Sequence, residues 1–510
     1  MVKMIGELID RLPSAELIGD PETLIHDLRF DSREVRPGTL FAALRGGYTD
    51  GHRFLHTARD AGAIAALVEP ETPAAEVVGY AAVVRVANTR AALAQVAAHW
   101  FDDPSRALTL VGVTGTDGKT TTSYLIEAML SANGLPTGLI GTVAIRVPGQ
   151  PERSAARQTT PESLDVQRYL AEMRDARARV AVLEATSHGL ETHRVDGCEF
   201  DVGVLTNVTH EHLDFHGSVE QYRIAKAGLL RRVVAAQAQG KRAVGVLNRD
   251  DEGTRAISSA GQGARLFWYS AQGDPAADLI AADVQVRSDG TSFRLQMPSG
   301  DAHVALHLPG RWNVSNALAA ASVGCALGLS PQQIADGLAS LGAVPGRMET
   351  VDAGQPFTVL VDYAHTPEAL RAVLSEARNL TSGRVLTLFG SAGERDLEKR
   401  AIQGAVAQEL AEFAIFTSED PRFEDADAII AEIAAGAEQA GGRRGVDFDC
   451  IEDRRDAIFE LISRARPGDV VILAGKGHER SMIYGDTQRA WDESAVAREA
   501  LAVSWRGAGL

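Results

Sequence analysis

A glycine-rich segment at residues 111–123, VGVTGTDGKTTTS, combines the residue types that bind a nucleotide triphosphate. Gly112, Gly115 and Gly118 allow backbone amides to turn toward phosphate oxygens, and the helix expected to follow adds the positive end of its dipole. Lys119 supplies a cation for the phosphates. Between an apolar strand and a helix, this combination predicts a phosphate-binding loop rather than a turn that binds nothing.

Other residues of this loop bear on the metal ion and on the loop type. The hydroxyl of Thr120 or Thr121 can ligate magnesium, and Thr116 belongs to the same loop. The generic phosphate-loop pattern has glycine where this chain has Val113, so the loop is a variant. Asp117 places a negative charge beside the phosphates, and we expect it to point away from them or toward the metal.

Carboxylate and imidazole groups follow two other apolar strands. Glu184 lies near the end of VAVLEA, where side chains of an open α/β sheet face the ligand crevice, although a lone glutamate could equally be structural there. The segment TNVTHEHLDFHGS, after the next apolar strand, contributes His210, His212, Asp214 and His216. Such a cluster offers ligands for a divalent ion, although magnesium prefers oxygen to imidazole nitrogen.

The order of these motifs resembles the central domain of the Mur ligases: GKTT, LEATSHG, TNVTHEHLDFHG and then Lys226. The resemblance implies that Thr120, Glu184 and His212 surround magnesium ions. It also implies that Lys226 is carbamylated and so becomes an oxygen ligand. From the sequence alone, a lysine on an amphipathic helix is usually a solvated surface residue, and an unmodified Lys226 would repel magnesium.

An N-terminal segment and two central ones resemble the family's contacts to a UDP-linked muramoyl-dipeptide. The segment at residues 30–54, FDSREVRPGTLFAALRGGYTDGHRF, is similar to the uridine-binding domain of the diamino-acid-adding members, although it could equally be an ordinary strand-turn-strand. Thr192 stands where some relatives carry glutamine. The residues that this resemblance assigns to the UDP-dipeptide are Ser32, Arg33, His52, Thr159, Thr160, Ser187 and Arg194.

Two later segments, LPGRWNVSNALAA and VPGRMETV, resemble the family's adenine and interdomain phosphate elements. The resemblance places Asn313, Asn316 and Arg347 at ATP, although either asparagine could instead cap a helix. Asp362 ends the apolar strand in FTVLVDYAHTP, ahead of His365, and could accept ribose hydroxyls.

Three further apolar strands end in charged residues, in LFGSAGERDLEKR, FTSEDPRFED and VILAGKGHERSM. Strand ends of one sheet converge on one crevice, and the residues expected there are Arg395, Asp420, Arg422, Gly475, Lys476 and Glu479. Similar enzymes that add meso-diaminopimelate carry DNPR where this chain has EDPR. Arg422 favours a substrate with a second carboxylate, whereas Asp420 would suit a bare ammonium, so lysine and ornithine stay open.

The elements that position these residues alternate between short apolar runs and stretches of helical period, which predicts an α/β fold. We expect three domains: a small α/β uridine-binding domain at 1–107, a central parallel-sheet ATPase-like domain at 108–346 and a Rossmann-like domain at 347–510. Within the central domain, residues 280–309 alternate with period two around an Asp-Gly turn, which predicts an antiparallel patch.

Composition limits the possible partners. The net charge of −17 opposes non-specific attachment to nucleic acid or an anionic bilayer. Three scattered cysteines without CxxC spacing give no disulfide framework or zinc site. The N-terminus does not resemble a signal peptide, and no apolar run could span a membrane. We therefore expect a cytoplasmic protein, and we expect a monomer.

Taken together, the motifs predict an ATP- and Mg²⁺-dependent ligase of cell-wall precursor synthesis. It would add a diamino acid, meso-diaminopimelate in the main reading, to UDP-N-acetylmuramoyl-L-alanyl-D-glutamate through an acyl phosphate. A folate polyglutamylating ligase shares the phosphate loop and the lysine but is disfavoured by the DSR and DGHRF segments. A nucleotide-binding regulatory module that has lost its chemistry is suggested only by Asp117 and EDPR.

Overall fold

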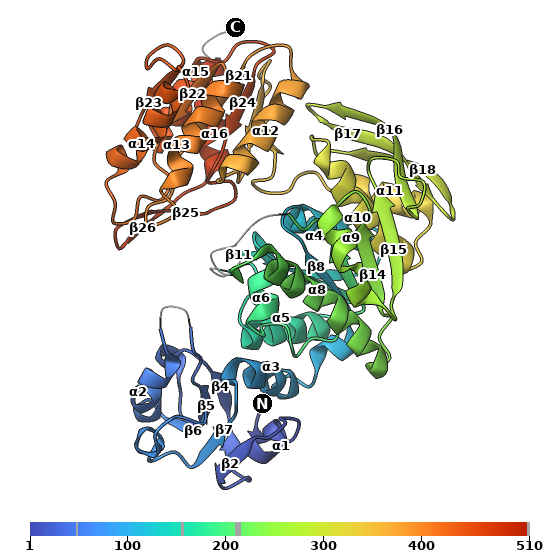
Figure 1. The fold of residues 1–510 in the computed structure, drawn as a ribbon, viewed down its shortest axis with the longest axis vertical. Helices are drawn as coiled ribbons and strands as arrows, with labels where there is room; N and C mark the ends of the chain where they lie inside the picture. The colour runs from blue at the N-terminus through green and yellow to red at the C-terminus, as the bar shows by residue number, and fades with distance from the viewer. Residues whose placement is uncertain (47–48, 155–157, 210–215, 507–510) are drawn as a thin grey trace. The chain divides into compact units, whose positions relative to one another are not determined.

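The computed structural model describes residues 1–46, 49–154, 158–209 and 216–506, and it confirms the predicted α/β class (Figure 1). The chain forms two compact units. The first comprises Met1–Ile280, Gln296–Gly300 and Ser315–Gly337, and the second comprises Ala281–Leu295, Asp301–Val314 and Leu338–Leu510. The boundaries expected near residues 107 and 346 remain predictions. Among the described helices, none is both long and apolar enough to cross a bilayer.

The N-terminal sheet of the first unit has five strands, parallel except for the pairing of β2 with β7. In sheet order they are β2 (Glu16–Gly19), β7 (Ala82–Arg85), β6 (Ala63–Val68), β5 (Thr39–Ala42) and β4 (Asp27–Arg29). Successive side chains of β5 enter opposite cores. Leu40 packs with α3 (Thr89–Trp100) and Phe41 with α2 (Leu55–Asp60), because strand side chains alternate between faces.

The central sheet holds the phosphate loop at the end of its middle strand. Its parallel strands, in sheet order, are β9 (Thr137–Ile140), β12 (Val180–Glu184), β8 (Thr109–Thr114), β13 (Val202–Leu205), β14 (Val244–Asn248) and β15 (Arg265–Ser270). Its longer helices include α4 (Lys119–Ala132), α5 (Ser163–Asp175), α8 (Val219–Ala236), α10 (Trp312–Ala326) and α11 (Pro331–Ala339). The strands are almost wholly buried, which explains why they read as unbroken apolar runs.

Further strands extend both ends of this sheet. β10 (Ala144–Arg146) and β11 (Arg153–Ser154) pair antiparallel beside β9. At the other end lie β16 (Leu279–Arg287), β17 (Gly290–Met297) and β18 (Gly300–Leu306). Only two residues connect β16 to its neighbour β17, so these strands form a hairpin where the sequence predicted an antiparallel patch.

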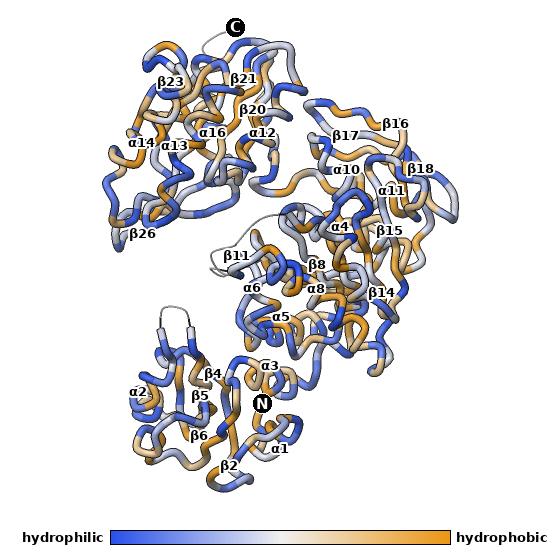
Figure 2. The backbone as a smooth tube through the Cα atoms, in the orientation of Figure 1, coloured by the Kyte–Doolittle hydropathy of each residue, from blue (hydrophilic) through white to orange (hydrophobic). Residues whose placement is uncertain are grey.

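The C-terminal sheet of the second unit has six strands. In sheet order they are β19 (Glu349–Thr350), β20 (Thr358–Val361), β24 (Val470–Leu473), β21 (Val385–Phe389), β22 (Phe413–Phe416) and β23 (Phe448–Cys450). The helices are α12 (Pro367–Leu380), α13 (Glu398–Leu410), α14 (Ala426–Gln439), α15 (Arg454–Ser463) and α16 (Glu493–Arg506). In Figure 2, β20 is largely hydrophobic, whereas β26 (Thr487–Ala490), in the exposed hairpin with β25 (Ser481–Tyr484), is hydrophilic.

A buried ion pair fixes the loops at the carboxyl ends of β22 and β24. Arg454 on α15 is 1% exposed and pairs with Glu493, at the start of α16, which is 0% exposed. The same guanidinium donates to the carbonyl oxygens of Ser418 at 3.2 Å and Ala474 at 2.7 Å. Because one carboxylate and two carbonyl oxygens meet around the same arginine, the loops that carry Asp420 and Gly475 are tied to α16.

We predict that Glu493→Ala lowers the free energy of unfolding of the C-terminal part by about 3–5 kcal/mol, because it leaves the Arg454 guanidinium buried without a counter-ion. Urea unfolding followed by circular dichroism measures the change. The matched control is Asp447→Ala, which breaks an exposed pair with Arg443 and should leave the unfolding midpoint unchanged. Equal effects of the two substitutions would contradict the prediction.

Candidate active site

The loop between β8 and α4 requires glycine at Gly115 because another loop packs directly against it. A Cβ at this position would stand 1.8 Å from Thr206 Oγ1 and 3.2 Å from the backbone nitrogen of Asn207. Thr206 also donates from its hydroxyl to the carbonyl oxygen of Asp117 at 2.5 Å. The residues at the carboxyl end of β13 therefore pack directly against the phosphate loop, and no side chain fits between them.

Gly118 is needed for a different reason. Its φ is +79°, in the left-handed region, and an added Cβ would stand 2.3 Å from Asn316 Oδ1. Asn316 Oδ1 also accepts a hydrogen bond from Thr122 Oγ1 at 3.3 Å, and Thr121 beside it is buried in α4. The amide of Asn316 thus lies against the start of α4, next to the predicted phosphate loop.

Two lysines converge on the loop backbone. Lys119 Nζ donates to the carbonyl oxygens of Gly115 at 2.9 Å and Thr116 at 2.6 Å. Lys226 Nζ, from α8, donates to the same Gly115 oxygen at 2.6 Å and lies 4.4 Å from the centroid of the Tyr222 ring. Lys226 is only 1% exposed, so the usual expectation of a solvated surface lysine is wrong here.

The side chain of Asp117 is exposed, whereas its backbone is fixed. Its amide donates to Asn207 Oδ1 at 2.8 Å, and its carbonyl oxygen accepts from Thr206. The structure holds position 117 through its backbone amide and carbonyl groups. This explains how the loop accommodates an aspartate at this position.

Glu184 is completely buried at the end of β12, among hydroxyl groups. Its Oε2 accepts from Thr120 Oγ1 at 3.0 Å and from Thr142 Oγ1 at 2.8 Å, and its Oε1 accepts from the Thr142 amide at 3.1 Å. Thr142 Oγ1 also lies 3.1 Å from Thr159 Oγ1. A carboxylate with neighbouring hydroxyl oxygens is the donor set that Mg²⁺ prefers, so these residues fit that ion.

Thr142 is a site residue that the sequence reasoning missed. It follows β9, which pairs in parallel with β12 so that Ile140 lies opposite Leu183. This register brings the residues just after both strands to one edge of the sheet. The available signal was a threonine directly after an apolar strand, but it becomes informative only once β9 is known to neighbour β12.

The predicted histidine ligands His210 and His212, and Asp214, lie outside the described residues. His216 is described, and its ring packs edge-on against His188 and Tyr222. Within the described parts of the chain, no three His, Cys, Asp or Glu side chains gather as a metal site. The role of His212 therefore stays a prediction.

The residues expected at the muramoyl-dipeptide surround the end of β12. Thr160 Oγ1 donates to the Glu184 carbonyl oxygen at 2.8 Å and accepts from the Thr186 amide at 3.0 Å. Arg194 donates to the Thr160 carbonyl oxygen at 2.9 Å and pairs with Glu162 at 3.3 Å. Burial lowers the pKa of Arg194. Ser187 begins α6 (Ser187–Glu191) and is buried, and Thr192 donates from its hydroxyl to the carbonyl oxygen of His188.

The residues expected at UDP lie in the N-terminal part of the first unit. Ser32 and Arg33 belong to a short 3₁₀ turn, where Arg33 Nε donates to Asp31 Oδ1 at 2.9 Å. His52 Nδ1 lies 2.7 Å from Asp50 Oδ1, and its Nε2 accepts from the Glu69 amide at 3.2 Å. Arg33 is exposed and oriented, whereas His52 uses both ring nitrogens to fix its own loop.

Three of the residues expected at ATP lie in the second unit. Asp362 accepts from the amides of Met348 at 2.8 Å and Ala364 at 2.9 Å, and burial raises its pKa although Arg347 opposes the shift. The Arg347 guanidinium lies 4.9 Å from the centroid of the Tyr363 ring. Asn313, at the start of α10, donates to the Pro309 carbonyl oxygen at 2.7 Å.

Two loops at the carboxyl ends of β22 and β24 meet in a cluster of charges. Lys476 Nζ lies 3.0 Å from Asp420 Oδ1 and 2.5 Å from Glu479 Oε2. Glu479 Oε1 accepts from the Tyr363 hydroxyl at 3.3 Å. Asp420, Lys476 and Glu479 therefore come together as the strand ends predicted.

Gly475 leaves room for a buried carboxylate beside this cluster. Its φ is +98°, and an added Cβ would stand 2.6 Å from Glu419 Oε2. Burial raises the pKa of Glu419 to about 7, although Lys399, Arg454 and Lys476 oppose the shift. Oε2 of Glu419 has no hydrogen-bond partner in the part of the chain that the structure describes.

The two arginines predicted at this cluster, Arg422 and Arg395, differ in their exposure. Arg422 has φ +55°, and its backbone is held by Ile483 O at 3.0 Å and by the Gly485 amide at 2.6 Å. Its buried Nε has no hydrogen-bond partner among the described residues. Arg395 is exposed, in a loop attached to the cluster by the bond from the Gly393 amide to the Asp420 carbonyl oxygen at 2.8 Å. The structure thus places the Arg395 loop at the cluster and leaves its side chain in solvent.

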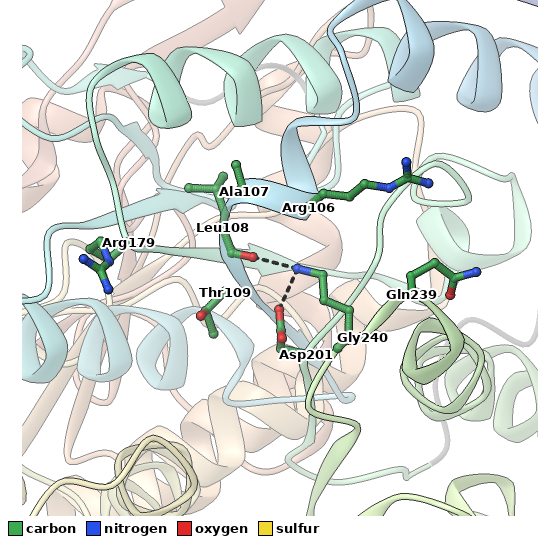
Figure 3. A pocket seen from close by; sticks show the side chains of 9 residues that line it. Arg106, Ala107, Leu108, Thr109, Arg179, Asp201, Gln239 and Gly240 are labelled. Carbon is green, nitrogen blue, oxygen red and sulfur yellow. Dashed lines mark hydrogen bonds and ion pairs between the residues drawn. The ribbon is translucent and has the colours of Figure 1, made fainter.

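A polar cavity of about 330 Å³ opens at the opposite, amino edge of the central sheet (Figure 3). Its charged groups Lys241 and Asp201 are paired with each other. Lys241 Nζ donates to the carbonyl oxygens of Ser105 and Leu108, both at 2.7 Å, and to Asp201 Oδ2 at 3.0 Å. Asp201 also accepts from the Leu110 amide at 2.9 Å. We therefore regard this cavity as a structural junction and not as the active site.

Comparison with known proteins points to one family. The chain matches the Mur ligase family, catalytic domain at residues 24–101, the Mur ligase middle domain at 113–324 and the Mur ligase, glutamate ligase domain at 346–477. A UDP-N-acetylmuramyl-tripeptide synthetase of Roseiflexus sp. (strain RS-1) is 48% identical over 93% of this chain and 94% of its own length.

Two further matches agree with it. A UDP-N-acetylmuramoyl-L-alanyl-D-glutamate--2,6-diaminopimelate ligase of Geobacter metallireducens is 41% identical over 94% of each chain. A solved structure of a ligase of the same name superposes on this chain with a TM-score of 0.69, at 29% identity and 99% coverage of both chains.

The pKa of Glu419 generates a prediction about stability. Between its unfolded value of 4.5 and its folded value of about 7, the folded protein holds a proton that the unfolded chain has lost. The stabilisation from Glu419 is therefore fully present below pH 4.5 and is lost as the pH rises through about 7, by on the order of 3 kcal/mol. We expect wild type to lose this stability relative to Glu419→Gln.

Urea unfolding of both proteins at about pH 5 and about pH 8 measures the effect. Glu438→Gln, at an exposed glutamate, is the matched control and should follow wild type at both pH values. Parallel pH profiles for wild type and Glu419→Gln would show that the Glu419 carboxyl titrates normally.

Proposed function

Because the chain belongs to the Mur ligase family, we propose that it is an ATP-dependent ligase that joins meso-diaminopimelate to UDP-N-acetylmuramoyl-L-alanyl-D-glutamate. The observation that carries the proposal is the convergence of Lys119 and Lys226 on the Gly115 carbonyl oxygen. It lies one strand away from the buried Glu184 carboxylate, since β8 and β12 are neighbours. This arrangement suits activation of a carboxylic acid by a triphosphate.

ATP binds at the loop of residues 115–121 in this proposal. The amides of Gly115 and Gly118 and the Lys119 ammonium meet the phosphates, whereas the amides of Thr116 and Asp117 donate to Asn207 and hold the shape of the loop. Thr121 lies in the first turn of α4. Asn313, Asn316, Arg347 and Asp362 serve the base, ribose and remaining phosphate. When bound, Mg²⁺ supplies positive charge that neutralises the phosphate oxygens. Thr120 and Glu184 hold it, together with His212 and a carbamate on Lys226, as the family resemblance implies.

The reaction proceeds in two displacements. An oxygen of the D-glutamate side-chain carboxylate attacks the γ-phosphorus, the bond from phosphorus to the β,γ-bridging oxygen breaks, and ADP leaves. The amine of the incoming amino acid then attacks the carbonyl carbon of the acyl phosphate, loses a proton and expels phosphate. The protein's contribution is largely positioning and charge neutralisation, with Lys119 opposing the charge on the transferred phosphoryl group.

Carrier-linked substrate and acceptor occupy separate groups of residues. The UDP-dipeptide site is formed by Ser32, Arg33, His52, Thr159, Thr160, Ser187 and Arg194, among which His52 fixes its loop through both ring nitrogens. The acceptor pocket is formed by Arg395, Asp420, Arg422, Gly475 and Glu479. The half-buried Arg422, whose Nε has no hydrogen-bond partner within the described ranges, supports an acceptor with a second carboxylate, because a guanidinium binds carboxylates through paired hydrogen bonds. The names of the two relatives described above agree with a reaction that adds diaminopimelate or forms a UDP-linked tripeptide.

The substrates also suggest where the protein works. ATP and a UDP-linked precursor are cytoplasmic compounds, so we place the enzyme in the cytoplasm as part of peptidoglycan precursor synthesis. We expect it to act as a monomer, with no nucleic-acid partner.

The first test is substrate dependence. Purified protein should release phosphate only when ATP, Mg²⁺, the UDP-dipeptide and diaminopimelate are all present, and mass spectrometry should identify the UDP-tripeptide. Parallel reactions with lysine and ornithine test the acceptor. We expect little product from either, because neither has a second carboxylate for Arg422 to bind. Equal phosphate release without any amino acid would overturn the ligase proposal.

A second test concerns Glu184. Glu184→Gln keeps the shape of the side chain but removes a buried negative charge, so we expect kcat to fall on the order of 10²-fold. The Mg²⁺ concentration for half-maximal rate should rise as well. The control is Glu22→Gln, at an exposed glutamate in the N-terminal part. A variant with wild-type Mg²⁺ dependence would remove Glu184 from the metal site.

A further inference from the structure

The charge cluster at the carboxyl ends of β22 and β24 is built around one completely buried lysine. Lys476 is 0% exposed and lies between Asp420 Oδ1 at 3.0 Å and Glu479 Oε2 at 2.5 Å. A buried ammonium is tolerated only when it is paired and hydrogen-bonded, and here both conditions hold. The two carboxylates are therefore held at fixed positions by the same nitrogen.

Asp420 is committed to this lysine and to the backbone. The same Oδ1 that faces Lys476 accepts from the Ile483 amide at 2.9 Å. Its residue is buried, so little water is available to screen the interaction with Lys476. The extra negative charge that aspartate brings to this position is consequently compensated inside the protein.

Glu479 is held from two sides. Its Oε2 faces Lys476, and its Oε1 accepts from the Tyr363 hydroxyl at 3.3 Å. The side chain of Glu479 is about one third exposed, in contrast to the lysine that orients it. Of the two carboxylates, Glu479 is thus the one that can meet a ligand in solution.

We propose that Lys476 is a positioning residue for the incoming amino acid: it compensates Asp420 and orients Glu479 toward the substrate ammonium. The inference rests on the proposed function. It implies that Asp420 does not select a bare ammonium, so the acceptor is chosen by Arg422 in spite of the acidic residue two positions before it. Asparagine at position 420 would keep the acceptor oxygen for the Ile483 amide and change only the charge.

The test measures KM and kcat separately for each substrate. Lys476→Met removes the ammonium while keeping an unbranched side chain, and we expect KM for diaminopimelate to rise at least about tenfold, with KM for ATP and for the UDP-dipeptide unchanged. In Lys476→Met/Asp420→Asn the uncompensated charge is gone, so part of the lost affinity should return. A double variant no better than the single one would overturn the proposed charge coupling.

Asp420→Asn alone provides a second route to the answer if Lys476→Met does not fold. We expect it to leave the ratio of kcat/KM for diaminopimelate to that for lysine unchanged. A shift of this ratio toward diaminopimelate by tenfold or more would show that Asp420 itself selects the acceptor, and would overturn the proposal.

A matched control separates this effect from the loss of any buried lysine. The Lys241 side chain is only 8% exposed and is also paired with an aspartate, Asp201, at the amino edge of the central sheet. Lys241→Met should leave KM for diaminopimelate unchanged, even if it lowers stability. A rise equal to that in Lys476→Met would assign the effect to general destabilisation and overturn the proposal.

The wild-type acceptor assay comes first, so that failure of the proposed function is recognised separately. If wild type adds lysine instead of diaminopimelate, the acceptor assignment fails, and the same variants are then measured with lysine. If wild type joins no amino acid at all, the ligase proposal has failed. The Lys476 proposal is then overturned with it, because it concerns the acceptor of that reaction.

Discussion

The site depends on one backbone oxygen at the end of β8. Gly115 presents its carbonyl to two ammonium groups, Lys119 from the following helix and Lys226 from α8, more than 100 positions further along the chain. Residue 115 must be glycine in this loop, since a Cβ would collide with Thr206 at the end of β13. The register of the parallel strands then places Glu184 at the same edge. Two lysines and a buried carboxylate are thereby brought to one edge of the central sheet.

A residue's role could be predicted from the sequence when that role depends on its neighbours in the chain. The phosphate loop is predictable because its glycines, lysine and threonines are adjacent in the chain and lie between an apolar strand and a helix. Glu184 could be predicted because strand ends of parallel sheets face ligands. Thr142 could not be, because its meaning comes from the pairing of β9 with β12. The burial of Lys226 likewise follows from packing of α8 against the phosphate loop, which periodicity does not reveal.

The acceptor pocket shows the same limit in its charges. At the level of sequence, Asp420 adds a negative charge and leaves the choice between a carboxylate-bearing and a simple diamino acid open. In the structure its partner Lys476 comes from a loop 56 residues away, and the two form a buried pair. Whether an acidic residue attracts a ligand cation or an internal one is decided by topology, because only the fold determines which charge stands within hydrogen-bonding distance.

The Arg454–Glu493 pair has a consequence for synthesis of the chain on the ribosome. Arg454 fixes the loops after β22 and β24, yet its counter-ion Glu493 lies 39 residues further along the chain, at the start of α16. The N-terminal and central sheets can form while translation continues, whereas these two loops are not secured until α16 has emerged from the exit tunnel. Nascent chains, and products of premature termination, would therefore carry a formed phosphate loop without a finished acceptor pocket.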